Sequence, residues 1–358
     1  GLETFIMNVY RHIDREKVQF DFLVHTNKKN DFDEEIYELG GKIYNVPPRN
    51  KSLLVNRKAL DNFFRTHNYK IIHHHSSSLS YIEPLIFAKK HNVPIRIIHG
   101  HSTKEGGKFI HSFIHRWHQL FINSYATHFF SCSSQVEKWM YGKKIKLVDK
   151  NKVKIINNGI STRNYSYSEV VRNKIRNELN IKDKFVIGHV GRFSYPKNHI
   201  FLLEVFKEVC KIEPNSILLL VGDGELRQKV EDKINELNLN DKVILTGKRN
   251  DVSVFLQAMD VFIFPSIYEG LPVTLIEAQS VGLPCLTSSN VSNEVKITDN
   301  LFFIDLASPV STWVDKVMEI KMSYVRTNKS DDVIKAGYDI EQISNYLQKF
   351  YITNFKPE

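Results

Sequence analysis

The stretch PSIYEGLPVTLIEAQ, residues 265–279, decides the fold of this chain. The apolar run 261–264 just before it is typical of a buried strand. Pro272 and Gly282 stand where the first position and the C-terminal cap of a helix favour these residue types. We therefore expect a strand, a tight loop and a helix. In a parallel sheet such a loop lies at the carboxyl edge, where ligands bind.

This loop has the features of a site for a phosphorylated ligand. Free N–H groups of Leu271, Val273 and Thr274 at the helix N-terminus would point at a bound anion. Glu269 and Glu277 flank that position, and both can accept hydrogen bonds from hydroxyls. This combination suits a sugar nucleotide, with its pyrophosphate at the helix N-terminus and its sugar and ribose on the two carboxylates. The simpler interpretation is that Glu269 complements the helix dipole and Glu277 is a solvated helix residue.

The two glutamates, with seven residues between them in an E-G-L-P…E-A-Q context, resemble the paired-glutamate motif of family 4 retaining glycosyltransferases, which have the GT-B fold. Further segments are similar to the exopolysaccharide and capsule branch of that family: 190–193, 197–199, 222–225, 282–285 and 294–299. The resemblance covers nearly the whole chain. It implies transfer of a sugar, with retention, from a nucleoside diphosphate donor, expected to be UDP-linked, to a saccharide or polyprenyl-linked saccharide hydroxyl.

Length and composition are those of a globular protein with two domains. The chain has 358 residues, 42% of them hydrophobic and 25% charged. No apolar run reaches the roughly 20 residues that a membrane-spanning helix needs, and the first residues lack the pattern of a secretion signal. The three cysteines, Cys132, Cys210 and Cys285, are widely scattered and predict no disulfide framework. We expect a cytoplasmic protein, with peripheral contact at the inner face of the cell membrane as an option.

The formal net charge of +9 indicates an anionic partner. Zinc-finger, RNA-recognition and basic-arm signatures are absent, so we expect no nucleic acid partner. A nucleotide and an anionic membrane surface remain. The segment 108–128 carries apolar residues at helical spacing, with His111, Arg116 and His118 between them. The simpler interpretation is that this stripe belongs to the core, and the alternative is that part of it docks on a membrane, where a lipid-linked acceptor would be found.

The first half of the chain alternates strands and helices. Residues 1–15 read as a helix, and the family resemblance puts a strand and a glycine pair ahead of it, so we expect that the sequence lacks its natural first strand. Helices are expected at 53–65 and 81–91. Strands suited to a parallel sheet are expected at 18–24, 42–44, 69–73, 94–99, 127–131 and 153–156. We assign 1–163 to an N-terminal, acceptor-binding Rossmann-like domain.

The second half repeats the pattern. Strands are expected at 185–190, 217–221, 243–246, 261–264, 284–287 and 301–304. Residues 164–337 would form a nucleotide-sugar-binding Rossmann-like domain, and 338–358 resemble the closing helix that returns to the first domain. The fold class is thus α/β, GT-B, with two doubly wound domains facing across a cleft.

Several residues of the second half are candidates for the donor site. Arg192 and Lys197 follow a strand in a loop where Gly191 permits close backbone approach, and the resemblance implies that they neutralise the leaving diphosphate. Gly222-Asp223-Gly224-Glu225 lacks the third glycine of a dinucleotide motif and is interpreted as a turn lining the same site. Gly247 and Arg249 are placed near the nucleobase, a plain surface turn being the alternative. Gly270, Leu271, Pro272 and Val273 complete the donor set.

Histidines of the first half are the other candidates. The family places a histidine against the transferred sugar, and here we choose His101 over His99. His73 and His75, with His99 and Gly1, are candidates for the acceptor side. A zinc site is the competing interpretation, but we expect none, because adjacent histidines of one strand point to alternate faces. Asp31-Phe32-Asp33 has metal-motif spacing but opens a helix, so we expect no metal and no cofactor beyond the donor substrate.

Two other functions fit the same fold. A sugar-nucleotide 2-epimerase would form product from the donor alone. A non-catalytic partner would bind nucleotide sugar or polysaccharide without turnover.

Overall fold

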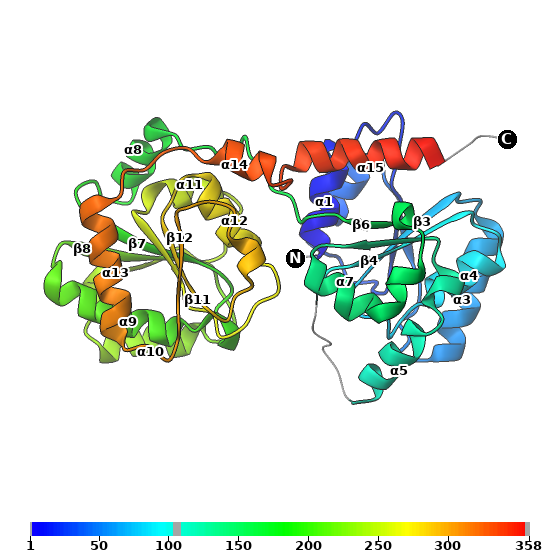
Figure 1. Cartoon of the computed structure of the whole chain (residues 1–358), viewed down its shortest axis with the longest axis horizontal. Coiled ribbons are helices and arrows are strands. Elements are labelled where there is room, and N and C mark those ends of the chain that lie inside the picture. The colour runs from blue at the N-terminus through cyan, green and yellow to red at the C-terminus, as the bar shows by residue number, and fades with distance from the viewer. Residues whose placement is uncertain (1, 103–108, 355–358) are drawn as a thin grey trace. The chain divides into compact units, whose positions relative to one another are not determined.

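The computed structural model describes residues 2–102 and 109–354 and divides the chain into two compact units, shown in Figure 1. Unit 1 lies within residues 1–159 and 340–358, and unit 2 within residues 160–339. The C-terminal helix therefore belongs to the same unit as the N-terminal half of the chain.

Unit 2 is built on one sheet of six parallel strands. Their order across the sheet is β12-β11-β10-β7-β8-β9. The first strand of the unit, β7, thus lies in the middle beside β10, and the direction of winding reverses between them. In doubly wound sheets ligands bind at the carboxyl ends of the strands at this reversal. The strands are β7 (Phe185–Val190), β8 (Ser216–Val221), β9 (Val243–Leu245), β10 (Val261–Phe264), β11 (Cys285–Ser288) and β12 (Leu301–Ile304).

Helices cover both faces of this sheet (Figure 1). Neighbouring residues of one strand, such as Val186 and Ile187 of β7, belong to different hydrophobic clusters, as do Phe262 and Ile263 of β10. Both faces are therefore buried, which explains why these strands read as continuous apolar runs. The helices are α8 (Glu169–Glu178), α9 (His199–Ile212), α10 (Arg227–Glu236), α11 (Val252–Ala258), α12 (Val273–Ser280), α13 (Val310–Ser323) and α14 (Ser330–Lys335).

Unit 1 differs from the single sheet that we expected. A parallel four-stranded sheet runs in the order β3-β4-β5-β6, and β1 and β2 form a separate parallel pair. Among the described strands no ladder joins the two sheets. Side chains connect them instead, since Phe22 of β1 packs in one hydrophobic cluster with Ile71 of β3 and Ile95 of β4. The strands are β1 (Phe22–Val24), β2 (Ile43–Asn45), β3 (Ile71–Ser76), β4 (Ile95–Gly100), β5 (His128–Ser131) and β6 (Val153–Ile155).

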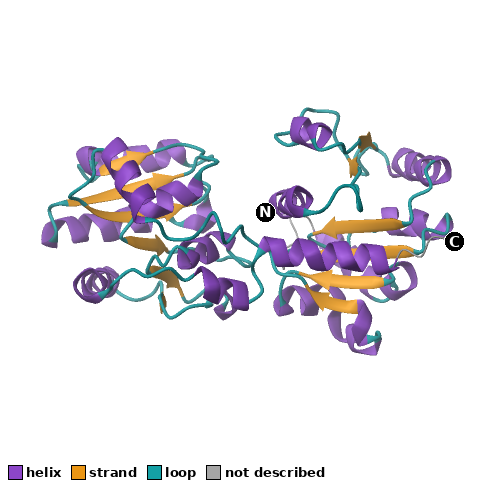
Figure 2. Ribbon diagram, turned by 90° about the horizontal axis from the view of Figure 1, so that it is seen from above, coloured by secondary structure: helices purple, strands orange, loops and turns teal. Residues whose placement is uncertain are grey.

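The last helix closes the core of unit 1. Helix α15 (Ile340–Asn354) packs against α1 (Leu2–His12) and lies across the four-stranded sheet, as Figure 2 shows. Its buried residues Leu347 and Tyr351 join Phe5 and Tyr10 of α1 in one cluster. The remaining helices are α2 (Asp33–Glu38), α3 (Leu53–Thr66), α4 (Glu83–Lys90), α5 (Phe109–Gln119), α6 (Ile122–Tyr125) and α7 (Ser134–Tyr141).

Candidate functional site

The strand, loop and helix expected around residues 261–282 are β10 and α12. Helix α12 begins at Val273, one residue later than predicted, because Pro272 has an extended conformation with ψ of 103°. Gly282 follows the helix with a φ of +66°, as a C-terminal glycine does. The N–H of Leu275 donates to the Pro272 carbonyl at 3.1 Å. Neither Val273 nor Thr274 donates its N–H to any described residue, so both donors are available to a ligand.

The loop after β7 meets the loop after β10 at the reversal of the sheet. The N–H of Ile267 donates to the Pro196 carbonyl at 2.8 Å. Lys197 Nζ lies 2.8 Å from Glu269 Oε1, and the two side chains are only 18% and 16% exposed. Lys197 Nζ also lies 4.3 Å from the ring centre of Phe264, at the end of β10. Lys197 and Glu269, which the sequence identifies separately as candidates for the donor site, thus form an ion pair that is shielded from solvent.

Arg192 occupies a different position from Lys197. Its Nε lies 2.9 Å from a carboxylate oxygen of Glu225, and its side chain is 72% exposed. The structure therefore brings Lys197 to Glu269 and leaves Arg192 on the rim, beside the turn that follows β8.

The glycines of the predicted donor set allow three loops to pack closely. Gly222, whose φ is +141°, donates its N–H to the Gly247 carbonyl at 2.9 Å. A Cβ on Gly222 would lie 2.0 Å from the carbonyl oxygen of Gly191, so only glycine fits. Gly191, Gly222 and Gly247 follow three adjacent strands and are brought together. Gly270 differs from them, because a Cβ there would meet no atom of the described residues within 4 Å.

Glu277 lies inside α12 and has a partner that sequence reasoning missed. Its half-buried carboxyl accepts a hydrogen bond from Tyr165, and burial raises its pKa to about 7 in spite of that bond. Tyr165 is far away in sequence and stands in no recognisable motif, so no sequence pattern indicates it.

Arg249 forms two hydrogen bonds with the Asp251 carboxylate, at 2.9 and 2.8 Å. Its place near the nucleobase stays a prediction.

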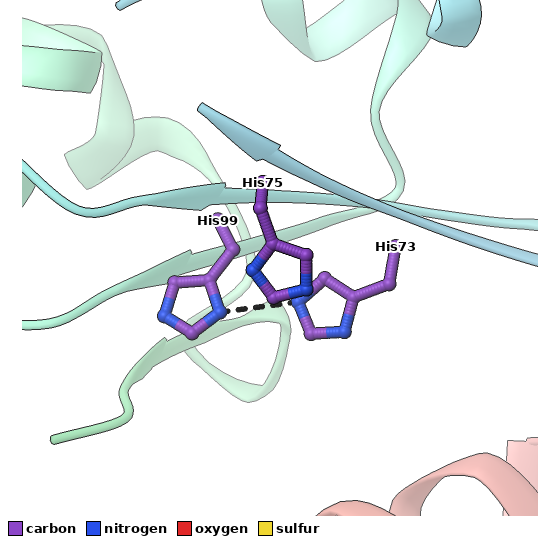
Figure 3. Close-up of side chains that lie close together, drawn as sticks. All are labelled: His73, His75 and His99. Atoms are coloured by element: carbon purple, nitrogen blue, oxygen red, sulfur yellow. Dashed lines mark hydrogen bonds between the residues drawn. The ribbon is translucent and has the colours of Figure 1, made fainter. Parts of the chain in front are cut away.

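The predicted histidines of unit 1 form a cluster, and Figure 3 shows three of them. His73 Nε2 lies 3.1 Å from His99 Nδ1, and His75 Nδ1 lies 2.9 Å from His101 Nε2. His74 faces the other way, with its Nε2 3.0 Å from the Tyr81 carbonyl oxygen. Alternation within β3 is as expected, and His74 does not converge with its two neighbours. The sequence did not predict that a histidine of another strand joins His73 and His75. His73 and His75 share one face, and β4 adds His99 beside them.

The four clustered imidazoles are neutral at physiological pH. Burial lowers the pKa of His73 to about 3 and that of His101 to about 4. Burial also holds the pKa values of His75 and His99 well below their usual range. Each ring therefore offers a lone pair. The role of His101 against the transferred sugar stays a prediction, and Gly1, the remaining acceptor-side candidate, lies outside the described residues.

Helix α5 and the turn after it leave part of the apolar stripe exposed, which contradicts the simpler interpretation that the stripe belongs to the core. Phe113, Trp117, Leu120 and Phe121 are 67%, 54%, 49% and 42% exposed. His115 is buried instead, and it accepts a hydrogen bond from the N–H of Leu79 at 3.0 Å. Lys108 and the side chains of residues 109 and 110 lie outside the description. None of the helices that the structure describes has both the length and the apolar character to cross a membrane.

Two family models match this chain. One, described as "Glycosyltransferase Family 4", matches residues 1–164, and the other, "Glycosyl transferases group 1", matches residues 171–350. The chain is also 30% identical to the putative glycosyltransferase EpsF of Bacillus subtilis over 98% of its own length and 93% of that protein. The chain belongs to the family 4, group 1 glycosyltransferases. This confirms the resemblance seen in the paired glutamates.

Two further comparisons bear on this glycosyltransferase. It is 27% identical to the UDP-Gal:alpha-D-GlcNAc-diphosphoundecaprenol alpha-1,3-galactosyltransferase of Escherichia coli, over 85% of this chain and 81% of that enzyme. Its fold is similar to that of HepE from Anabaena, solved in complex with UDP, with a TM-score of 0.74 at 16% identity over 99% of this chain and 96% of that one. The GT-B fold predicted from the sequence is thereby confirmed.

Proposed function

We propose that this glycosyltransferase moves the sugar of a UDP-sugar to a hydroxyl of a saccharide or polyprenyl-linked saccharide in surface polysaccharide synthesis. The anomeric configuration of the sugar is retained. The observation that supports this proposal most strongly is the shielded Lys197–Glu269 ion pair, at the point where the strand order of the unit 2 sheet reverses. Beside it α12 presents the N–H groups of Val273 and Thr274 without acceptors among the described residues. The UDP in HepE and in the name of the E. coli relative supports the choice of nucleotide.

In the proposed reaction the bond between the anomeric carbon and the diphosphate oxygen breaks, and its electron pair leaves with UDP. The acceptor oxygen forms the new bond to that carbon, and its proton goes to the departing diphosphate oxygen. Lys197, Arg192 and the N-terminus of α12 stabilise the charge that develops on the diphosphate. Glu269 accepts hydrogen bonds from the donor sugar while its ion pair with Lys197 fixes both side chains. Glu277 accepts a hydrogen bond from the ribose.

The test is transfer by the full chain from UDP-sugars to a synthetic polyprenyl diphosphate saccharide, followed by mass spectrometry and by NMR of the new anomeric proton. We expect a product one sugar longer than the acceptor that keeps the donor's anomeric configuration. Inversion would contradict the proposed stereochemistry. A new sugar nucleotide formed from the donor alone would indicate an epimerase, and donor binding without any product would indicate a non-catalytic protein.

We also propose that the exposed side chains of α5 and the turn after it contact an anionic membrane surface. Phe113, Trp117, Leu120 and Phe121 are apolar and exposed, and Arg116 beside them is an exposed cation. Such a surface inserts apolar groups between lipid head groups and pairs cations with their charge. The undecaprenol diphosphate acceptor named for the E. coli relative supports this proposal.

The three cysteines bear on which face of the membrane the protein contacts. All three are free thiols, which supports a location at the cytoplasmic face.

Sedimentation with vesicles tests this contact. We expect the chain to bind vesicles rich in phosphatidylglycerol, and Phe113→Ser together with Trp117→Ser to weaken that binding about tenfold or more, since each apolar side chain contributes more than about 1 kcal/mol on burial. Val170→Ser in α8, which removes an apolar residue of unit 2 that is 80% exposed, serves as the control. Equal loss in the control, or none in the α5 variant, would contradict the proposal.

A further inference from the structure

We propose that His73, His75 and His99 form a binding site for a transition-metal ion of the zinc class in unit 1. All three histidines lie in unit 1, and the proposal does not depend on the proposed sugar transfer.

The geometry of the three rings carries this proposal. One nitrogen from each ring can be chosen so that all three lie within 4.8 Å of one another. His73 Nε2 and His99 Nδ1 are already 3.1 Å apart. In a tetrahedral zinc site with Zn–N bonds of about 2.0–2.1 Å, two ligand nitrogens are about 3.3–3.4 Å apart. An ion can therefore replace the hydrogen bond drawn between these two rings in Figure 3 with a small movement of either side chain.

The strand register explains why the rings converge. His75 of β3 pairs directly with His99 of β4, and His73 lies two residues earlier on the same face of β3. The rings of His73 and His75 stack with centroids 4.1 Å apart, and those of His73 and His99 with centroids 5.2 Å apart. The three side chains therefore lie close together on one face of the β3–β4 pair, and the backbone holds them there.

Groups around the cluster are placed to orient its rings. Tyr351 Oη lies 2.7 Å from His73 Nδ1. In the tautomer in which Nδ1 carries the proton and donates it to this oxygen, the lone pair of Nε2 is directed at His99. His101 stands in the same relation to His75, with its Nε2 2.9 Å from Nδ1 of that ring. Metal-binding histidines commonly use their second nitrogen in this way, and the outer partner fixes the tautomer.

The types of the three ligands indicate which kind of ion would bind. Three imidazoles without a carboxylate favour zinc, cobalt, nickel or copper over magnesium and calcium, which prefer oxygen ligands. Three protein ligands leave a fourth position for water or for a hydroxyl. The site thus lies among the residues predicted to face the acceptor, and an ion here would order that side of unit 1.

The experiment uses the full chain, stripped with a chelator and titrated with Co²⁺, whose visible absorption reports coordination by nitrogen. We expect one Co²⁺ per chain with the intense bands of a four- or five-coordinate ion, displaced by one equivalent of Zn²⁺. His99→Ala and His75→Asn should each remove stoichiometric binding. Tyr351→Phe, which removes an outer partner, should weaken Co²⁺ binding by about 10-fold to 100-fold.

His74→Ala is the matched control, because this residue lies on the same strand but faces away from the cluster. It should keep the Co²⁺ spectrum and stoichiometry of the native chain. Circular dichroism shows which variants are folded. If a variant is unfolded, Co²⁺ binding by the native chain alone tests the proposal. Absence of stoichiometric Co²⁺ binding by the native chain, an unchanged spectrum in His99→Ala, or equal loss in folded His74→Ala would overturn the proposal.

Discussion

Lys197 and Arg192 are both predicted to bind the diphosphate, but their surroundings differ. Lys197 is shielded beside Glu269, whereas Arg192 is exposed and paired with Glu225. Charge stabilisation is stronger where water is excluded. We expect Lys197→Ala to lower kcat/KM for transfer by about 100-fold to 1,000-fold, as loss of a preorganised charge partner does, and Arg192→Ala to lower it less. Steady-state kinetics measure both effects.

Lys211→Ala is the control for these variants, because Lys211 forms an exposed ion pair with Glu208 away from the donor loops. It should leave transfer unchanged. Full activity in both Lys197→Ala and Arg192→Ala would show that the diphosphate binds elsewhere.

Gly270 and Gly282 flank α12, and their surroundings place different demands on the two positions. A Cβ on Gly282 would lie 1.7 Å from the Thr327 carbonyl oxygen, whereas a Cβ on Gly270 meets open space among the described residues. We expect Gly282→Ala to lower the melting temperature markedly. Gly270→Ala should keep the melting temperature of the native chain and weaken UDP binding, because the methyl group enters the space assigned to the donor. Calorimetric melting and UDP titration separate the two effects, and tight UDP binding by Gly270→Ala would contradict this placement.

Glu277 gives a pH dependence whose sign follows from its burial. Its pKa rises from the ordinary 4.5 to about 7 in the folded chain. Between these values the folded state holds a proton that the unfolded state releases, so the free energy of unfolding falls as pH rises. We expect Glu277→Gln to flatten this part of the stability profile, measured by urea unfolding from pH 5 to 8. Exposed Glu236→Gln should leave the profile unchanged. A profile that keeps its slope in Glu277→Gln would contradict the assignment.

Among the elements, the strands of unit 2 were the most predictable. The bounds of β7, β10 and β12 agree with those read from the sequence, because strands buried on both faces are uninterrupted apolar runs between turn residues. The buried face of α5 was not predictable. His115 is held there by hydrogen bonds to the main chain of distant segments, and apolar periodicity carries no information on such bonds.

The histidine cluster shows a second limit of prediction from the sequence. Alternation along β3 follows from the sequence alone, but the pairing of His75 with His99 depends on the register between β3 and β4. A shift by one residue would turn the facing side chains to the opposite face. The sequence therefore nominates these histidines separately, and only the sheet brings them together. The same holds for Lys197 and Glu269, which meet through the strand order.

Helix α15 is expected to carry much of the stability of unit 1. Leu347 is 1% exposed within the cluster formed with α1. Leu347→Ala should lower the stability of unit 1 by about 2–5 kcal/mol, as truncation of a buried leucine does. The neighbouring Tyr346 is 37% exposed, so Tyr346→Ala should cost much less. Denaturant unfolding followed by hydrogen exchange of unit 1 amides compares the two, and equal losses would contradict the packing described for α15.

For the whole molecule, the sequence predicted the α/β class, the GT-B fold and the family, because the paired-glutamate loop and the glycine turns are local patterns. The division of unit 1 into two sheets was not predicted, since strand pairing depends on contacts between distant segments. The two units contain separate hydrophobic clusters. Folding of each unit around its own core therefore follows from the distribution of apolar residues.

The central claim is that the loops after β7 and β10 bind a nucleoside diphosphate. The most direct measurement is isothermal titration of the full chain with UDP in EDTA, repeated with Lys197→Ala. We predict binding of one UDP per chain, unaffected by EDTA, and weakened at least about 100-fold in Lys197→Ala, in line with loss of a buried charge partner. Absence of UDP binding by the native chain, or equal affinity in the variant, would contradict the claim.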